Sequence, residues 1–176
     1  MKINFKKLQQ LIIEKIKSEE NIVLKAHEVK FQVEPNYTLS DNRMTFKILI
    51  FGQQFLHGYA DHNNTEPDLI SDCFSRLHDY GKDSVKWHIW SLKILDLELR
   101  YEYQFDKIRD FLFDNIPDLK PRDISIQISD ISADETDENG FPKYGLYIEY
   151  PYKTIEIELD IYNYDYQLLE SFIEKF

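Results

Sequence analysis

Hydrophobic residues near the start of the chain recur at helical spacing. The segment from Phe5 to Ser18 carries them on one face and lysines on the other, and Asn4 stands where a helix N-cap belongs. The apolar positions are Phe5, Leu8, Leu11, Ile12 and Ile16. This pattern predicts an amphipathic helix over residues 5–18.

The next segments alternate between apolar and polar residues. Between Ile22 and Val33 the alternation is clearest at its end, and it stops before Pro35. Two further apolar runs follow, from Met44 to Phe51 and from Phe55 to Tyr59, separated by a break at Gly52. A period of two is typical of half-buried strands, so these three runs predict an antiparallel meander.

The pattern in the middle of the chain predicts a helix, then a strand, then a second helix. Thr65 is a candidate N-cap for an apolar stripe that ends near Gly81, and residues 105–116 have helical spacing up to Pro117. The stripe consists of Leu69, Ile70, Cys73, Phe74 and Leu77. Between the two helices, residues 85–103 alternate most clearly from Leu95 to Tyr103, which predicts a strand.

The last third predicts three strands and a closing helix. Residues 124–129 alternate, residues 144–150 and 154–162 form a hairpin around Pro151-Tyr152, and residues 166–176 have helical spacing. No linker rich in Gly, Pro or Ser divides the chain. We therefore expect one α+β domain over residues 1–176, with an antiparallel or mixed sheet of about six strands packed with about four helices.

Composition narrows the class of protein. The chain has 176 residues, of which 43% are hydrophobic, and a formal net charge of −11. Such a charge disfavours nucleic-acid binding, and the absence of any long apolar run predicts a soluble, cytoplasmic protein without a membrane segment. The single cysteine, Cys73, lies on a predicted apolar stripe, which favours a buried structural thiol. Glycine-rich nucleotide motifs are absent from the sequence, and we expect no cofactor.

The negative charge is concentrated in one part of the chain. Residues 1–60 hold nine basic and six acidic side chains, a net charge of +3. Residues 130–174 hold twelve acidic side chains against Lys143 and Lys153, a net charge of −10. The acidic residues are therefore a feature of the C-terminal segment rather than of the whole surface.

Alternation within this segment places acidic residues on one face of a strand. If Ile155, Ile157 and Leu159 point inward, the residues between them form an outward row about 6 to 7 Å apart. The preceding strand of the hairpin adds to the same face, and the acidic loop before it extends the charge. The predicted partner-binding residues are Tyr147, Glu149, Glu156, Glu158, Asp160 and Tyr162, with Asp134, Glu135, Asp137 and Glu138 from the loop.

Two interpretations of this face are open: a solvated surface that keeps the protein soluble, or a docking surface for a basic protein. The profile is similar to that of small intracellular inhibitors and of bacterial toxin-immunity proteins, which cover a cationic active site with carboxylates and tyrosines. This similarity implies a non-catalytic binding protein that neutralises a basic partner, such as a nuclease toxin.

Two alternatives remain. The segment His57-Gly58-Tyr59-Ala60-Asp61-His62 is a loop candidate for a metal site of an enzyme, although its spacing matches no standard metal motif. The aromatic residues Trp87 and Trp90 would suit a contact in a larger assembly if they are exposed, and they are core residues otherwise.

Overall fold

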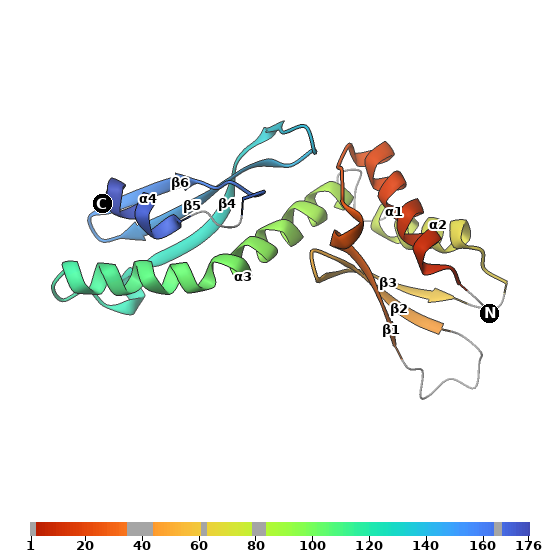
Figure 1. Cartoon of the computed structure of the whole chain (residues 1–176), viewed down its shortest axis with the longest axis horizontal. Coiled ribbons are helices and arrows are strands. Elements are labelled where there is room, and N and C mark those ends of the chain that lie inside the picture. Colours follow the sequence, from red (N-terminus) through yellow and green to blue (C-terminus); the bar gives the residue numbers. More distant parts are fainter. Residues whose placement is uncertain (1–2, 35–43, 61–62, 79–83, 164–166) are drawn as a thin grey trace. The chain divides into compact units, whose positions relative to one another are not determined.

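The structure is a computed structural model that describes residues 3–34, 44–60, 63–78, 84–163 and 167–176. Within these residues it contains four α-helices and six strands, so the α+β class is confirmed. The strands are divided between two three-stranded antiparallel sheets, with the orders β1-β2-β3 and β4-β5-β6 (Figure 1). No helix of this part of the chain is long and apolar enough to cross a membrane.

The chain divides into two compact units. Unit 1 comprises Met1–Lys93 with Glu138–Phe141, and unit 2 comprises Ile94–Asp137 with Pro142–Phe176. The single domain predicted over residues 1–176 is not tested by this division and stays a prediction.

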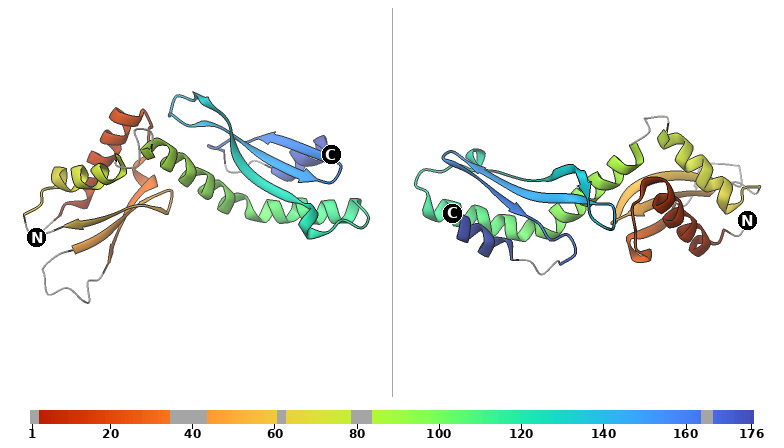
Figure 2. Two further views of the ribbon diagram at one scale, coloured as in Figure 1. Left: turned by 180° about the vertical axis from the view of Figure 1, so that it is seen from behind. Right: turned by 90° about the horizontal axis from the view of Figure 1, so that it is seen from above.

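Unit 1 pairs a three-stranded meander with two helices. Its elements are α1 (Phe5–Glu20), β1 (Val29–Glu34), β2 (Met44–Ile50), β3 (Gln53–Ala60) and α2 (Glu66–His78). Figures 1 and 2 show α1 and α2 on one face of the sheet. That face is apolar: the ring of Phe5 on α1 contacts Phe31 and Phe46 of the strands, at centroid distances of 5.4 and 6.5 Å.

The predicted helix starts in unit 1 have the expected caps. The Asn4 side chain accepts a hydrogen bond from Lys7 N at 3.1 Å, and Thr65 Oγ1 accepts from Asp68 N at 3.4 Å. Each bond satisfies a backbone donor that has no partner within the first helical turn. The predicted closing residue Gly81 lies outside the described residues.

The strand predicted over residues 22–33 is too long. Residues Ala26–Glu28 form a turn of 3₁₀ helix, in which the Glu28 carboxylate accepts from Lys25 N at 2.7 Å. Val23 N donates to Asn139 O at 2.9 Å instead of joining a ladder of this sheet. The apolar residues Ile22 and Leu24 are buried all the same. Burial without strand pairing explains why the apolar pattern extended further than the strand does.

The strand predicted over residues 85–103 is wrong. These residues belong to one helix, α3 (Ser84–Asn115), which also includes most of the third predicted helix. Leu97, Tyr101 and Phe105 follow each other at helical spacing and are buried. The intervening apolar residues Leu95, Leu99 and Tyr103 lie on a different face of the same helix and are 45%, 62% and 70% exposed. The apparent period of two therefore arose from two helical stripes offset by two residues.

Unit 2 packs helices on one face of its sheet. Its remaining elements are β4 (Ser125–Thr136), β5 (Pro142–Tyr150), β6 (Lys153–Glu158) and α4 (Leu168–Lys175). The predicted hairpin around Pro151-Tyr152 is present, with Tyr150 opposite Lys153. Helix α4 lies beside α3 (Figures 1 and 2), where Leu168 N donates to Gln104 Oε1 and the rings of Phe172 and Phe111 are 5.8 Å apart.

Candidate functional site

The face of the unit 2 sheet that α3 and α4 leave open carries most of the predicted site. Leu146, Ile148, Ile155 and Ile157 are buried on the inner face, as the alternation predicted. The side chains between them point outward, and Glu149, Glu156 and Glu158 are exposed while Tyr147 is half-buried. We call Tyr147, Glu149, Glu156 and Glu158 the acidic sheet face.

The strand register places the tyrosine against a carboxylate. Tyr147 lies directly opposite Glu156, Glu149 lies opposite Thr154, and Glu158 lies opposite Gly145. The missing side chain at position 145 leaves room beside the Tyr147 ring, since a Cβ there would lie 3.2 Å from its Cε2 atom. Partial burial, then the negative charges of Glu156 and Asp130, raise the pKa of the Tyr147 phenol. The phenol therefore stays protonated and can donate a hydrogen bond.

The nearby lysines leave much of this negative charge uncompensated. Lys143 Nζ lies 3.5 Å from Glu158 Oε1. The alternation pattern along one strand does not predict this ion pair between strands. Both side chains are more than half exposed, at 57% and 61%, so the pair is weak. Lys175 Nζ instead donates to the main-chain oxygen of Glu156 at 2.7 Å, and Lys153 Nζ donates to main-chain oxygens of Lys175 and Phe176. These two lysines anchor α4 to the edge of the sheet.

The predicted row of acidic residues is shorter than expected, because β6 ends at Glu158. The Asp160 carboxylate accepts from Tyr162 N at 3.0 Å and from Asn163 N at 3.1 Å, and thereby closes a turn. Tyr162 is turned by this bend, and its hydroxyl donates to the Asp137 carboxylate. Asp160 and Tyr162 therefore do not extend the strand row, and Tyr162 and Asp137 are partners of each other.

The other predicted acidic residues are not all in a loop. Asp134 and Glu135 belong to the end of β4, which extends to Thr136 beyond a register shift, while Glu138 lies in the turn that follows. All three side chains are exposed. Asp134 and Glu135 lie between Ser132 and Thr136, which pair with the first residues of β5, Lys143 and Pro142, so they are outside the acidic sheet face.

The predicted metal site is not assembled by the described residues. His57 lies on β3 rather than in a loop, and its Nε2 atom is 2.9 Å from Glu34 Oε2. Asp61 and His62, the other two candidates, lie outside the described residues. Among the residues that the structure does describe, no group of three or more His, Cys, Asp or Glu side chains could hold a metal ion.

Sequence reasoning missed the ionic cluster that holds His57. Glu34 on β1 accepts from Lys47 Nζ on β2 at 2.6 Å as well as contacting His57 on β3. The hydrogen bond from Lys47, followed by that from His57, lowers the pKa of the Glu34 carboxyl. Period-two alternation places each residue on the outer face, but the cluster depends on the register between three strands, which a single sequence does not specify.

The two tryptophans and the cysteine are divided between core and surface. Trp90 is buried, and its Nε1 donates to Gly140 O at 3.0 Å, whereas Trp87 is 48% exposed and packs edge-on against Trp90. Cys73 is a free, buried thiol, as predicted. No protein-family model, curated protein or solved structure matches the chain.

Proposed function

We propose that the protein is a non-catalytic binding protein whose acidic sheet face covers a basic surface of a protein partner, in the manner of a toxin-immunity protein. The observation that carries the proposal is the group of exposed carboxylates of Glu149, Glu156 and Glu158 around Tyr147. Like charges on neighbouring strands repel one another, and a cationic partner relieves that repulsion when it binds.

The surface suits a protein partner better than a nucleic acid. Carboxylates repel phosphate groups, and the face is an open sheet surface. Tyr147 supplies the rigid, amphipathic ring that is frequent at the centre of protein interfaces. Serine and glutamine side chains of β4 complete the outer face beside it, at Ser125 and Gln127. A tyrosine surrounded by exposed carboxylates resembles an interface centre with a charged rim.

Binding by this surface requires little rearrangement of the protein itself. The Lys143–Glu158 pair is exposed, so a guanidinium of the partner can replace the lysine at small cost. The main-chain bonds of Lys175 and Lys153 keep α4 in place and need not be broken. Exposed carboxylates also steer a cationic partner during diffusional encounter, which raises the association rate.

Inhibition follows if the covered surface is the one the partner uses. A nuclease needs cationic side chains to bind phosphate, so carboxylates docked on those side chains block the substrate. A nuclease toxin is therefore the kind of partner that we expect, and this protein would need no catalytic residue of its own.

The test uses the products of genes adjacent to this one as candidate partners, because inhibitors are often encoded beside their targets. Glu156→Lys with Glu158→Lys reverses two charges on the acidic sheet face. Glu102→Lys with Asp110→Lys is the matched control, because these exposed acids lie on α3 of the same unit and the charge change is equal. We expect the first variant to lower the association rate constant about tenfold at low salt, and the control to lower it much less.

Surface biosensing at two salt concentrations measures both rates, and an activity assay of the partner shows inhibition by a stoichiometric amount of the wild type. The proposal fails if the Glu156→Lys, Glu158→Lys variant binds as the wild type does. Equal losses in both variants would show only a general charge effect, which would also contradict a docking role for this face.

A second candidate function, a subunit of a larger assembly, is favoured by the exposed stripe Leu95, Leu99 and Tyr103 on α3. Large apolar side chains at consecutive i, i+4 positions suit packing against another helix. Sedimentation at micromolar concentration separates the candidates: a monomer contradicts self-assembly, and an oligomer that dissociates in Leu99→Lys supports it.

A further inference from the structure

Among the described strands, β1 forms an open edge of the unit 1 sheet. Strand β1 is the edge strand of its sheet and pairs only with β2 among the described strands. Phe51 N donates to Glu28 O at 2.9 Å, so the backbone groups of Glu28 point toward β2. In an antiparallel pair, the backbone groups of successive residues point alternately toward and away from the neighbouring strand. By this alternation the backbone groups of Lys30 and Gln32 face β2, and those of Phe31 and Val33 face the open side.

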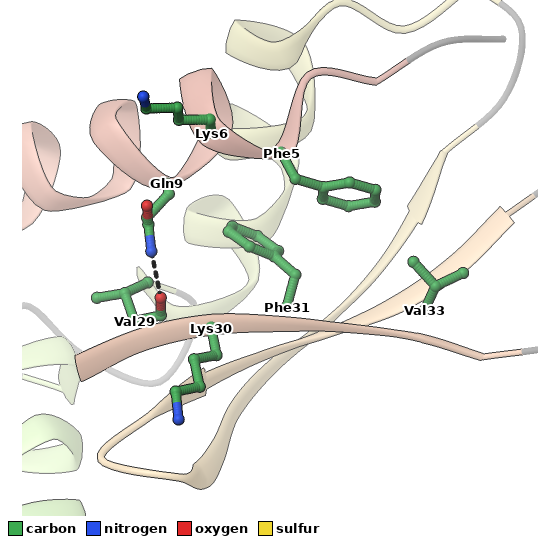
Figure 3. Close-up of a pocket in the computed structure, with 7 residues that line it drawn as sticks. All are labelled: Phe5, Lys6, Gln9, Val29, Lys30, Phe31 and Val33. Carbon is green, nitrogen blue, oxygen red and sulfur yellow. Dashed lines mark hydrogen bonds between the residues drawn. The ribbon is translucent and has the colours of Figure 1, made fainter. Parts of the chain in front are cut away.

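Helix α1 covers only the beginning of this edge. Gln9 Nε2 donates from the open side to Val29 O at 2.6 Å (Figure 3), and it also donates to Ala26 O at 2.7 Å. Beyond this point, the described part of the chain supplies no hydrogen-bond partner to the open-side backbone groups of Phe31 and Val33. The remaining edge therefore presents donors and acceptors in the arrangement that another strand requires.

A groove with an apolar wall runs beside these backbone groups. It has a volume of about 410 Å³ and lies between α1 and β1. Figure 3 shows the rings of Phe5 and Phe31 pointing toward one another, with Val33 further along the strand. Val33 is 47% exposed although it is apolar. The lining residues are Phe5, Lys6, Gln9, Val29, Lys30, Phe31 and Val33.

Within the described residues, the part of the edge beyond Gln9 has no bulge, no inward-pointing charge and no covering element. Proteins protect edge strands with bulges, inward-pointing charges or a covering element. Strand β1 instead pairs with β2 in continuous register from Val29 to Glu34, without a bulge. An edge of this kind beside an apolar groove is the combination by which some domains bind peptides as an added strand.

The charge of the groove selects among peptides. Two lysines, Lys6 and Lys30, are among its lining residues, and no acidic residue is. Neither lysine forms an ion pair within the described residues. Lys30 extends from the face of β1 opposite to Phe31 (Figure 3). An added strand alternates its side chains in the same way, so every second residue would enter the groove and the residues between would lie near Lys30.

We propose that the open edge of β1 binds an extended peptide segment of a partner protein, in which apolar and acidic residues alternate, as a fourth strand of the unit 1 sheet. The apolar side chains occupy the groove beside Phe5 and Phe31, and carboxylates lie against Lys30. This site takes acidic segments, whereas the acidic sheet face of unit 2 takes basic surfaces, so the two sites are distinct in chemistry and independent in their tests.

The experiment is an NMR titration of the full ¹⁵N-labelled chain with a synthetic peptide that alternates valine and glutamate over about eight residues, the length of an ordinary strand. We expect the amides of Phe31 and Val33 to shift and to become protected from hydrogen exchange. A peptide that alternates valine and lysine is the matched control, and we expect it to bind about tenfold more weakly.

Two variants locate the peptide. Val33→Pro removes an N–H that faces the open side and makes no ladder bond with β2, so the sheet is expected to persist while peptide affinity falls about fivefold. Val33→Thr keeps that N–H and is the control. Lys30→Glu is the second test, which retains its value if the proline variant does not fold, and it should reverse the preference between the two peptides.

Three results would overturn the proposal. One is peptide binding that leaves the Phe31 and Val33 amides unchanged, and another is equal affinity for the glutamate and lysine peptides. The third is a stable dimer in sedimentation that Val33→Pro returns to monomer and that does not bind the peptide, because this would assign the edge to a second copy of the chain.

Discussion

The two sheets differ in the contacts that the acidic residues on their open faces make. Both are three-stranded antiparallel meanders with helices on the opposite face. In unit 1, Glu34 lies between Lys47 Nζ at 2.6 Å and His57 Nε2 at 2.9 Å. In unit 2, Glu156 lies opposite Tyr147, and the lysine nearest to it in the hydrogen-bond network, Lys175, contacts its main-chain oxygen.

This difference distinguishes a carboxylate that joins strands of its own sheet from carboxylates that do not. The Glu34 carboxylate is used within its own sheet, where it joins three strands. Among the described residues, the carboxylates of the acidic sheet face make one ion pair, the exposed contact of Glu158 with Lys143 at 3.5 Å, and it joins no third strand. Net charge alone does not distinguish the two cases, whereas the position of the nearest cation does.

The largest expected effect is on the free energy of unfolding, when one glycine in each sheet is replaced by alanine. A Cβ at Gly58 would lie 2.4 Å from the Cζ atom of Phe46, a ring that is fully buried beneath α1. A Cβ at Gly145 would lie 2.9 Å from Cγ1 of Ile131, a half-buried side chain that can change its rotamer. We expect Gly58→Ala to lower the free energy of unfolding by about 3 kcal/mol and Gly145→Ala by about 1 kcal/mol or less.

Urea unfolding measures both changes. Combining Gly58→Ala with Phe46→Leu removes the clashing ring and should recover part of the loss, because the smaller side chain leaves space for the methyl group. Equal losses for the two alanine variants would show that the Phe46 ring can move as readily as Ile131. That result would remove the contrast between a rigid inner face and an adaptable outer face.

Sequence patterns identified most elements of the fold because each of those elements has one buried face. The first helix, the hairpin around Pro151-Tyr152 and the closing helix were predicted in this way. The N-terminal part of α3 was missed because the helix carries a second apolar stripe, centred on Leu99, that is exposed. Alternation of apolar and polar residues is the pattern of a half-buried strand. From Leu95 to Tyr103 the same pattern arises because a buried and an exposed apolar stripe of one helix are offset by two residues.

The candidate site was predicted in part for a similar reason. Alternation placed Tyr147, Glu149, Glu156 and Glu158 on one face, and the register agrees. It did not show that Asp160 would bind backbone N–H groups and end the strand, because a short polar side chain can cap a turn as well as continue a strand. Nor did it show the ion pair of Lys143 with Glu158, which depends on contacts between strands.

The next largest effect is a difference between the two sheets in how Tm changes when a carboxylate is removed. Glu34→Gln should lower Tm at about pH 7, because a neutral amide with one acceptor oxygen replaces the carboxylate that Lys47 and His57 share. Glu156→Gln should leave Tm unchanged or raise it slightly, because it removes repulsion on the acidic sheet face. Thermal unfolding followed by circular dichroism measures both.

Acid titration sharpens this contrast. The pKa of Glu34 is lowered from its ordinary value of 4.5 in the folded state, so the unfolded chain binds the proton more tightly. The stabilisation is therefore complete above about pH 4.5, the unfolded-state value, and is lost as the pH falls through the lower folded-state value. Glu34→Gln should have a flatter dependence of Tm on pH in this acidic range than Glu156→Gln. Parallel curves would contradict the role assigned to Glu34.

The smallest expected effect concerns the Tyr147 phenol. Burial raises its pKa above the ordinary value of 10.0, and the charges of Glu156 and Asp130 raise it further. Glu156→Gln should therefore lower the pKa of Tyr147 without restoring the ordinary value, because the contribution of burial remains. Glu149→Gln is the control, since Glu149 lies opposite Thr154 rather than Tyr147. Titration of ¹³C-labelled tyrosine by NMR resolves the two variants, and an equal decrease in both would show that the charge of the whole face, rather than the register neighbour, acts on the phenol.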